Sequence, residues 1–143
     1  MKIIEKIVAY GHNNISCTHG TTIELTKDKH LSRKGNCILG INASKSCYDL
    51  NTNLKQAIFN GNKLKVTLKV DNFIDNFDGY GSKQLSLSNK NDIVFRKSNF
   101  ICDRTILINC TKSSNELNRD MIKLLNNPEK KIKITFILND TDG

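Results

Sequence analysis

The sequence predicts an α+β fold, mostly β, arranged as an internally duplicated, pseudo-twofold, β-barrel-like domain with two flanking helices. Three observations predict it. The chain aligns with itself as two similar units. Apolar residues alternate with period two in each unit, which is typical of half-buried strands. Each unit also carries one helix-capping signal.

The internal repeat extends over nearly the whole chain. Its two segments are 71–101 against 1–31, without a gap, and 102–138 against 35–70, with one extra residue. Two copies are too few for a solenoid, so the units are expected to share one core. We therefore expect a single domain, 1–143, built from repeats 1–70 and 71–138.

Each unit is expected to contribute four strands. In the first unit they fall at 3–10, 15–25, 37–43 and 64–70. Their equivalents in the second unit are 73–80, 85–95, 104–110 and 132–138. So many short strands in one small domain favour a closed or nearly closed barrel.

One helix is predicted between the last two strands of each unit. A capping box, in which a hydroxyl precedes a carboxylate by three residues, marks each start: Ser46 with Asp49, and Ser113 with Glu116. Gly61 and a single proline at position 128 are expected to end the helices.

Composition is that of one globular domain, with 38% hydrophobic and 25% charged residues and no linker. The first ten residues carry Glu5 and Lys6 in an apolar run, so no signal peptide or membrane span is predicted. An odd number of cysteines, five, argues against a disulfide framework. We expect a cytoplasmic protein without a membrane partner, and its oligomeric state is not predicted.

The net charge of +8 is unevenly distributed. Residues 1–70 hold ten Lys and one Arg against four acids, or +7, whereas residues 71–143 hold eight Lys and three Arg against ten acids, or +1. A general compositional bias affects both halves alike, so the difference indicates a basic face on the first unit. That face is either a functional anion site or a solvated lysine surface.

The cysteines are interpreted as structural. Four of them align with a different residue in the other unit: Cys17 with Leu87, Cys37 with Arg104, Cys47 with Ser114, and Cys110 with Ala43. No metal and no cofactor is predicted, because spacing identifies no complete ligand set. The residues to inspect for a metal are His12, Cys17, His19 and Cys37.

Two histidines are candidates for acid/base catalysis. His12 follows Gly11 at a predicted turn, from which it can project into solvent or into a cleft. His19 aligns with Asn89, which favours a polar group near a strand end, with acid/base work as the alternative.

Lys45 and Lys112 lie immediately before the two caps, where the helix macrodipole disfavours a cation. Each therefore either pairs with a nearby acid or stands beside free N–H groups to receive an anion. Lys27 and Lys97, at equivalent strand ends, are candidates to join the same anion sites, although a solvated lysine at a strand end is the commoner case.

Asp103 and Arg104 have no counterpart in the first unit. This asymmetry permits a functional role, although an Asp/Arg pair on a strand is more often a surface salt bridge. Arg96 and Lys97 add positive charge nearby.

Three segments resemble an archaeal family known as domain of unknown function 371: GHNNISCTHGTTIELTKD (11–28), GNCILGINASKSC (35–47) and DIVFRKSNFICDRT (92–105). The resemblance covers nearly the whole chain. It implies an archaeal cytosolic protein of this size and brings no activity with it. The positions that it brings forward are His12, Asn14, His19, Glu24, Lys27, Arg96, Lys97, Asp103 and Arg104.

Two function classes remain. The favoured class is a binding module for a phosphate-bearing partner, RNA or a nucleotide, with Lys27, Lys45, Arg96, Lys97, Arg104 and Lys112 as candidate ligand-binding residues. The alternative is a small-molecule enzyme acting on an anionic metabolite, with His12 or His19 as acid/base paired with Glu24 or Asp103. An enclosed polar cleft would favour the enzyme, and an open basic face would favour nucleic acid.

Overall fold

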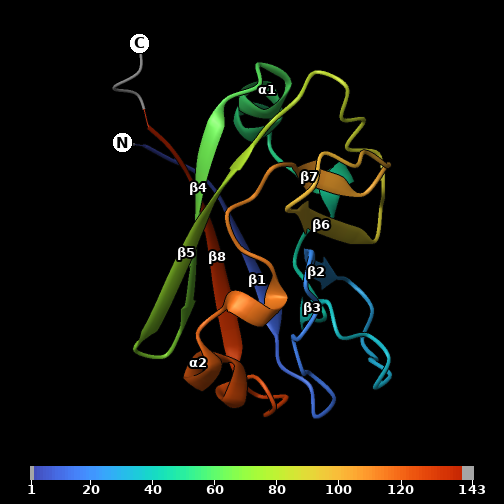
Figure 1. Cartoon of the computed structure of the whole chain (residues 1–143), viewed down its shortest axis with the longest axis vertical. Helices are drawn as coiled ribbons and strands as arrows, with labels where there is room; N and C mark the ends of the chain where they lie inside the picture. The colour runs from blue at the N-terminus through green and yellow to red at the C-terminus, as the bar shows by residue number, and fades with distance from the viewer. Residues whose placement is uncertain (1, 140–143) are drawn as a thin grey trace.

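A computed structural model describes residues 2–139 as two four-stranded sheets packed face to face (Figure 1). The long sheet is antiparallel, with the strand order β1 (Lys2–Tyr10), β8 (Lys131–Leu138), β4 (Lys63–Val70) and β5 (Phe73–Tyr80). The short sheet has the order β3 (Ile38–Gly40), β2 (Thr22–Thr26), β6 (Asp92–Arg96) and β7 (Thr105–Leu107). Its central pair is antiparallel and its two outer pairs are parallel. The mostly-β, α+β prediction is confirmed at this level.

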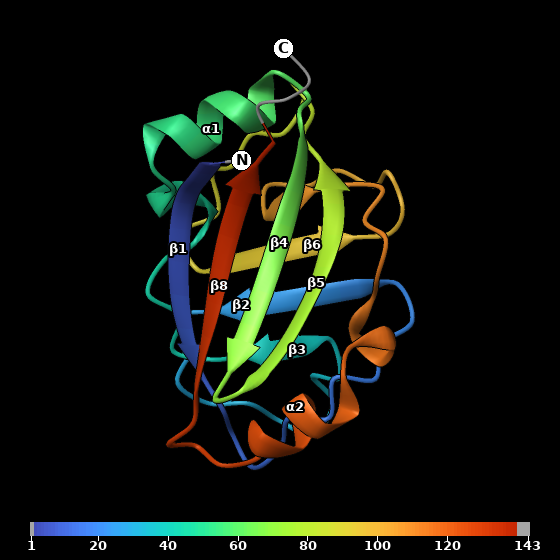
Figure 2. The same cartoon turned by 90° about the vertical axis from the view of Figure 1, so that its left-hand side faces the viewer.

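The facing sides of the two sheets form one hydrophobic core. Phe95 of β6 packs edge-on against Phe77 of β5, with ring centroids 5.2 Å apart. It also stacks on Phe136 of β8, with centroids 6.1 Å apart. Strands of the short sheet run across those of the long sheet (Figure 2), as in crossed sheet packing. Each sheet therefore keeps one outer face.

The two helices lie at opposite ends of this sandwich (Figure 2). Helix α1 (Thr52–Phe59) buries Leu54 and Ile58 against the core, and α2 (Arg119–Leu124) buries Met121 and Ile122. Neither helix lies over the outer face of the long sheet, which faces the viewer in Figure 2.

The predicted helix starts are corrected by the structure. The capping boxes begin short 3₁₀ turns, η1 (Cys47–Asp49) and η2 (Ser114–Glu116). Each α-helix starts about one turn later, where Asn51 and Asn118 accept hydrogen bonds from the backbone N–H groups of Leu54 and Met121. The sequence contains both signals, and asparagine is as good an N-cap as serine.

The expected closed or nearly closed barrel is not found as a closed barrel, because the described strands form two four-stranded sheets. Two single-residue bridges connect the sheets. Tyr10 at the end of β1 pairs with Ile41, which follows β3, and Tyr80 at the end of β5 pairs with Ile108, which follows β7. Beside each bridge one more backbone hydrogen bond joins the same segments, from Ser44 N–H to the Val8 carbonyl and from Thr111 N–H to the Asp78 carbonyl. The sheets are therefore joined over a few residues at two corners. Closure depends on such pairings, which hydrophobic alternation does not encode.

Strands 15–25 and 85–95 are also shorter than predicted, because only their last residues join the short sheet as β2 and β6. Cys17 and Leu87 have φ near +50° (49° and 51°), which interrupts an extended strand at equivalent positions. The guanidinium of Arg119 donates hydrogen bonds to the carbonyls of Ser16 and Cys17, in place of a strand partner.

The two units contribute matching strands to each sheet. Reading either strand order from its other end exchanges β1 with β5, β4 with β8, β2 with β6, and β3 with β7. In the central pair the residues opposite each other run from Thr22 with Arg96 to Thr26 with Asp92, centred on Glu24 with Val94. Matching order is not a superposition, so duplication by a twofold rotation stays a prediction.

Candidate functional site

Both lysines at the capping boxes are paired with buried carboxylates. Lys45 Nζ lies 3.0 Å from both carboxylate oxygens of Glu5, and Lys112 Nζ lies 2.6 Å from Asp75 Oδ1. The same carboxylates accept the backbone N–H of Asn51 at 2.8 Å and of Asn118 at 2.7 Å. Of the two sequence interpretations, pairing with an acid is therefore the one observed.

Lys27 and Lys97 are paired in the same symmetric manner. Lys27 Nζ lies 2.7 Å from Asp49 and Lys97 Nζ lies 2.7 Å from Glu116. The hydrogen bond from each lysine lowers the pKa of its carboxyl partner to about 2. Each carboxylate also accepts the N–H and hydroxyl of its own capping serine. All four candidate lysines thus hold the helix-start loops in place.

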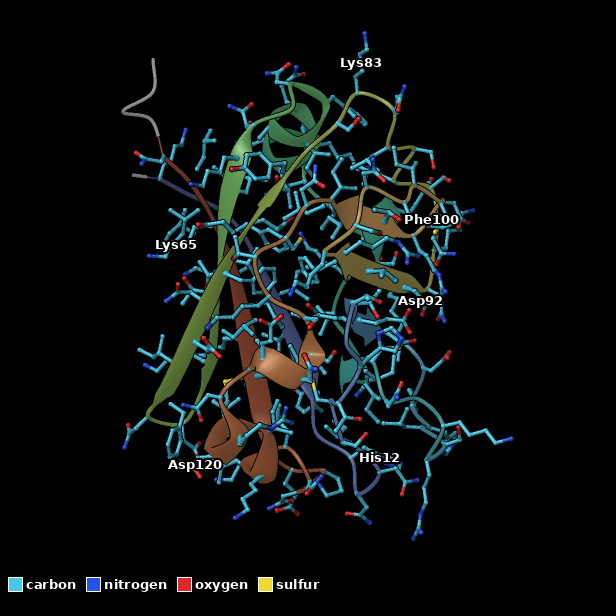
Figure 3. The ribbon with its side chains drawn as sticks, in the orientation of Figure 1. His12, Lys65, Lys83, Asp92, Phe100 and Asp120 are labelled. Carbon is cyan, nitrogen blue, oxygen red and sulfur yellow. The ribbon has the colours of Figure 1, made fainter. Side chains whose placement is uncertain are left out.

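The histidines do not form a catalytic pair with the candidate acids. His12 Nδ1 accepts the backbone N–H of Asn14 at 3.0 Å, in a loop well separated from Asp92 (Figure 3). His19 Nδ1 accepts the backbone N–H groups of Thr21 and Thr22, each at 3.2 Å. Across residues 2–139, neither ring hydrogen-bonds Glu24 or Asp103.

Other candidate residues do meet, in a polar cluster on the outer side of the short sheet. Arg104 Nη1 lies 3.0 Å from Glu24 Oε1 on β2 and 3.5 Å from Asp92 Oδ2 on β6. Asp103 directly precedes Arg104 in the chain. One oxygen of its carboxylate accepts a hydrogen bond of 3.2 Å from the side chain of Asn89. Burial raises the pKa of the Glu24 carboxyl to about 7, against the opposing effect of Arg104.

Arg96 lies in the same polar cluster and contacts Cys102. Its guanidinium donates to Thr105 Oγ1 at 2.9 Å and to Cys102 Sγ at 3.3 Å, and it lies 4.8 Å from the centre of the Phe100 ring. Partial burial raises the pKa of the Cys102 thiol, but hydrogen bonds with Thr105, the Arg104 N–H and Arg96 outweigh it and bring the pKa to about 7. Cys102 is therefore the thiol with most thiolate character near neutral pH.

The remaining thiols contrast with it. Burial raises the pKa of Cys17 to about 11 and of Cys47 and Cys110 to about 12, and it also raises the pKa of Cys37. Alignment of the two units predicts structural cysteines and does not single out Cys102. Its place two residues before Arg104 was the available signal. Within residues 2–139, no three His, Cys, Asp or Glu side chains are arranged to hold a metal ion.

A second feature, the outer face of the long sheet, was also missed. In β4 and β8 the odd-numbered residues are turned away from the core and the even-numbered ones are mostly buried. The outward positions of the long sheet carry one acid, Asp78, and six lysines. We call this surface the lysine face, and its lysines are Lys6, Lys63, Lys65, Lys69, Lys131 and Lys133. Alternating K-L-K-V and K-I-K-I in the sequence was the signal for it.

Among residues 2–139, most lysines of this face have no acidic partner. Lys63 lies 3.8 Å from Asp78, and no other lysine of the face is within 4.0 Å of an acid among the described residues. Lys69 and Lys133 are direct cross-strand neighbours on β4 and β8. Figure 3 shows Lys65 pointing away from the molecule, on the side opposite Asp92 and Phe100. Four of the six lysines belong to residues 1–70, the more basic half.

Comparison with known proteins agrees with the resemblance in the sequence. Residues 7–139 match the family described as domain of unknown function (DUF371). The chain belongs to this family. It is similar to an uncharacterised protein of Methanocaldococcus jannaschii, with 44% identity over 119 residues that cover 83% of this chain and 88% of the relative. Within the described part of this DUF371 protein, no helix has the length and apolar character to cross a membrane.

Proposed function

We propose that this DUF371 protein is an RNA-binding module that holds the phosphate backbone on its lysine face. The observation that carries the proposal is the cross-strand pair Lys69 and Lys133. Like charges directly opposite each other on neighbouring strands destabilise a sheet. No acid within the described residues forms an ion pair with either lysine, so an external anion is the partner that offsets their repulsion.

The extent of the lysine face favours a polymer over a single nucleotide. Strand β4 presents Lys63, Lys65 and Lys69 on the same side. A strand rises about 3.4 Å per residue, so the six steps from Lys63 to Lys69 span roughly 20 Å. Several successive phosphates fit along such a row.

The shape of this surface also fits a nucleic acid. The face is open, because the two helices cover the ends of the sandwich and the short sheet covers the other side (Figure 2). An open basic face was the feature expected to distinguish nucleic-acid binding from an enclosed active site. The helix-start lysines, by contrast, already have carboxylate partners.

Salt dependence of RNA binding tests this proposal. Single-stranded RNA of about 20 nucleotides with hydroxyl ends is titrated by fluorescence anisotropy between about 50 and about 200 mM salt. Each lysine that neutralises a phosphate adds about −0.7 to the slope of log K against log salt. Lys69→Gln and Lys133→Gln are each expected to make the slope shallower by about that amount.

Two control variants keep the test specific. Lys123→Gln removes a charge from the exposed side of α2, and Lys27→Gln removes one already paired with Asp49. Both should leave the slope unchanged. Negligible affinity at low salt, or equal losses in the controls and the face variants, would exclude RNA binding by this face.

The cluster on the short sheet supports a second candidate, an enzyme acting on an anionic metabolite. Glu24, with a pKa near 7, has the proton affinity of an acid/base group, and Arg104 beside it is 42% exposed. Small anionic metabolites are screened by thermal shift against the protein and Arg104→Gln. A metabolite that stabilises only the parent protein would favour this function.

A further inference from the structure

A cleft of about 440 Å³ opens at one end of the lysine face. It lies where β4 turns into β5 and where the chain enters β8. The cleft is lined by Lys69, Asp71, Glu129, Lys130, Lys131 and Lys133. Three of these lysines belong to the lysine face, so the cleft continues the proposed RNA surface.

The charges in the cleft are only partly balanced. Lys130 Nζ lies 2.6 Å from Asp71 Oδ2, which neutralises that pair. Glu129 is the other acid of the lining, so four lysines and two acids give the cleft a formal charge of +2. Lys69, Lys131 and Lys133 form no ion pair with a described acid, and their ammonium groups are available to a ligand.

We propose that this cleft binds a phosphate monoester, the terminal phosphate of an RNA chain; the choice of RNA as the source rests on the function proposed above. A phosphate monoester carries close to two negative charges at neutral pH and three strong acceptor oxygens. An internal phosphodiester carries one. The doubly charged group matches the formal charge of the cleft and accepts from several lysines at once.

The acids of the lining explain why a chain end fits better than the middle of a chain. Asp71 follows the last residue of β4, and Glu129 stands two residues before the start of β8. Both therefore lie beyond the end of the sheet. Lys130 balances the charge of Asp71, so Glu129 is the acid that a strand of RNA continuing past the cleft would meet. A chain that ends in the cleft avoids it.

The test compares RNAs that differ only at their ends. Matched oligonucleotides with a 5′-phosphate, a 3′-phosphate or hydroxyl ends are titrated against the full chain at about pH 7.5, where the monoester is doubly charged. One phosphorylated form is expected to bind about tenfold more tightly than the hydroxyl form, which is the effect of one or two additional charge-assisted hydrogen bonds. The preference should shrink severalfold at about pH 5.5, below the second pKa of about 6.

Two lysine variants locate the effect. Lys131→Gln, in the cleft, should remove most of the preference for the phosphorylated end, and it should weaken hydroxyl-ended RNA no more than Lys65→Gln does. Lys65→Gln, outside the cleft lining, should weaken all the RNAs alike and leave the preference intact. Circular dichroism and thermal unfolding confirm that both variants fold. No preference in the parent protein, or a preference that survives Lys131→Gln, overturns the proposal.

Competition with adenosine monophosphate and inorganic phosphate separates the sources of the monoester. Weak competition by both supports the RNA end. If the free nucleotide binds as tightly as the RNA end, the RNA end is overturned as the source. Binding of the nucleotide without any binding of hydroxyl-ended RNA would refute the RNA function and the RNA end as the source, and would leave a monoester site in the cleft. Binding of hydroxyl-ended RNA without a preference for phosphate would refute only the cleft.

Discussion

Glu24 gives the strongest link between the geometry of the short sheet and a measurable property. Its side chain is 11% exposed and it contacts Arg104 at 3.0 Å, yet burial raises its pKa from 4.5 to about 7. The folded chain therefore holds a proton that the unfolded chain has lost between about pH 4.5 and about pH 7. Stability from this group is fully present below pH 4.5 and is lost as the pH rises through about 7.

The size of the effect follows from the two pKa values. Each tenfold change in proton affinity corresponds to about 1.4 kcal/mol, so the full difference amounts to roughly 3 kcal/mol. The Glu24 side chain is itself 11% exposed, and water that reaches its carboxyl relieves part of the burial penalty. We expect about 1–2 kcal/mol of unfolding free energy to be lost between about pH 5 and about pH 8.

Glu24→Gln isolates this contribution, because glutamine keeps the shape and cannot ionise. Urea denaturation of the parent and the variant gives their difference in unfolding free energy at each pH. The variant should gain about 1–2 kcal/mol relative to the parent on going from about pH 5 to about pH 8. Asp78→Asn, a more exposed carboxylate on the long sheet, should show no such gain.

The opposite result is equally informative. If Glu24→Gln loses more stability at about pH 8 than at about pH 5, the carboxylate is ionised in the folded protein and its ion pair with Arg104 dominates. In that case Glu24 is structural, and the acid/base role of the second candidate function should be dropped.

Three further outcomes are expected. Cys102 should be alkylated by iodoacetamide faster than the buried thiols, with a rate that rises through about pH 7, as followed by peptide mass spectrometry; equal rates for all thiols would contradict its low pKa. Lys45→Gln should lower the unfolding free energy by about 1–3 kcal/mol, because it leaves a buried carboxylate short of a donor, whereas Lys27→Gln, whose partner is 33% exposed, should change it by less than about 1 kcal/mol. Asn51→Ala should cost about 1 kcal/mol as loss of a helix N-cap, and an unchanged urea midpoint would contradict that cap.

Sequence patterns predicted the positions of the four strands of the long sheet well, and the reason is physical. Its strands alternate between core and solvent over eight or nine residues, so period two is visible in the sequence. The strands of the short sheet have three or five residues, which is too short for alternation to mark their ends. Residues 15–21 alternate as well, but a backbone φ of 49° at Cys17 breaks the extension. The residue types around Cys17 do not predict this change of backbone conformation.

Strand pairing lay outside the reach of sequence patterns. Alternation indicates which residues face the core and says nothing of which edges meet. The expected barrel required ladders between the edge strands β1 and β5 and the short sheet. The structure has one bridge at each of these corners, Tyr10–Ile41 and Tyr80–Ile108.

Lys45 and Lys112, beside the helix starts, were predicted to need a negative partner, and they have one within the protein. A cation beside a helix start needs a compensating anion, and the sequence left open whether a protein carboxylate or a ligand supplies it. Glu5 and Asp75 supply it, from strands about 40 residues away in the chain (separations of 40 and 37). Such distant partners are visible only in three dimensions.

The lysines of the lysine face differ from those at the helix starts in having few acidic partners among the described residues. A lysine that already contacts a buried carboxylate gains little from a phosphate, since binding would have to break that pair. Lys69 and Lys133 have the opposite balance: they face each other across neighbouring strands and have no described acid within 4.0 Å. An anion relieves their repulsion without breaking a protein contact. The free energy available for binding a phosphate is therefore greatest where the protein leaves its cations unpaired.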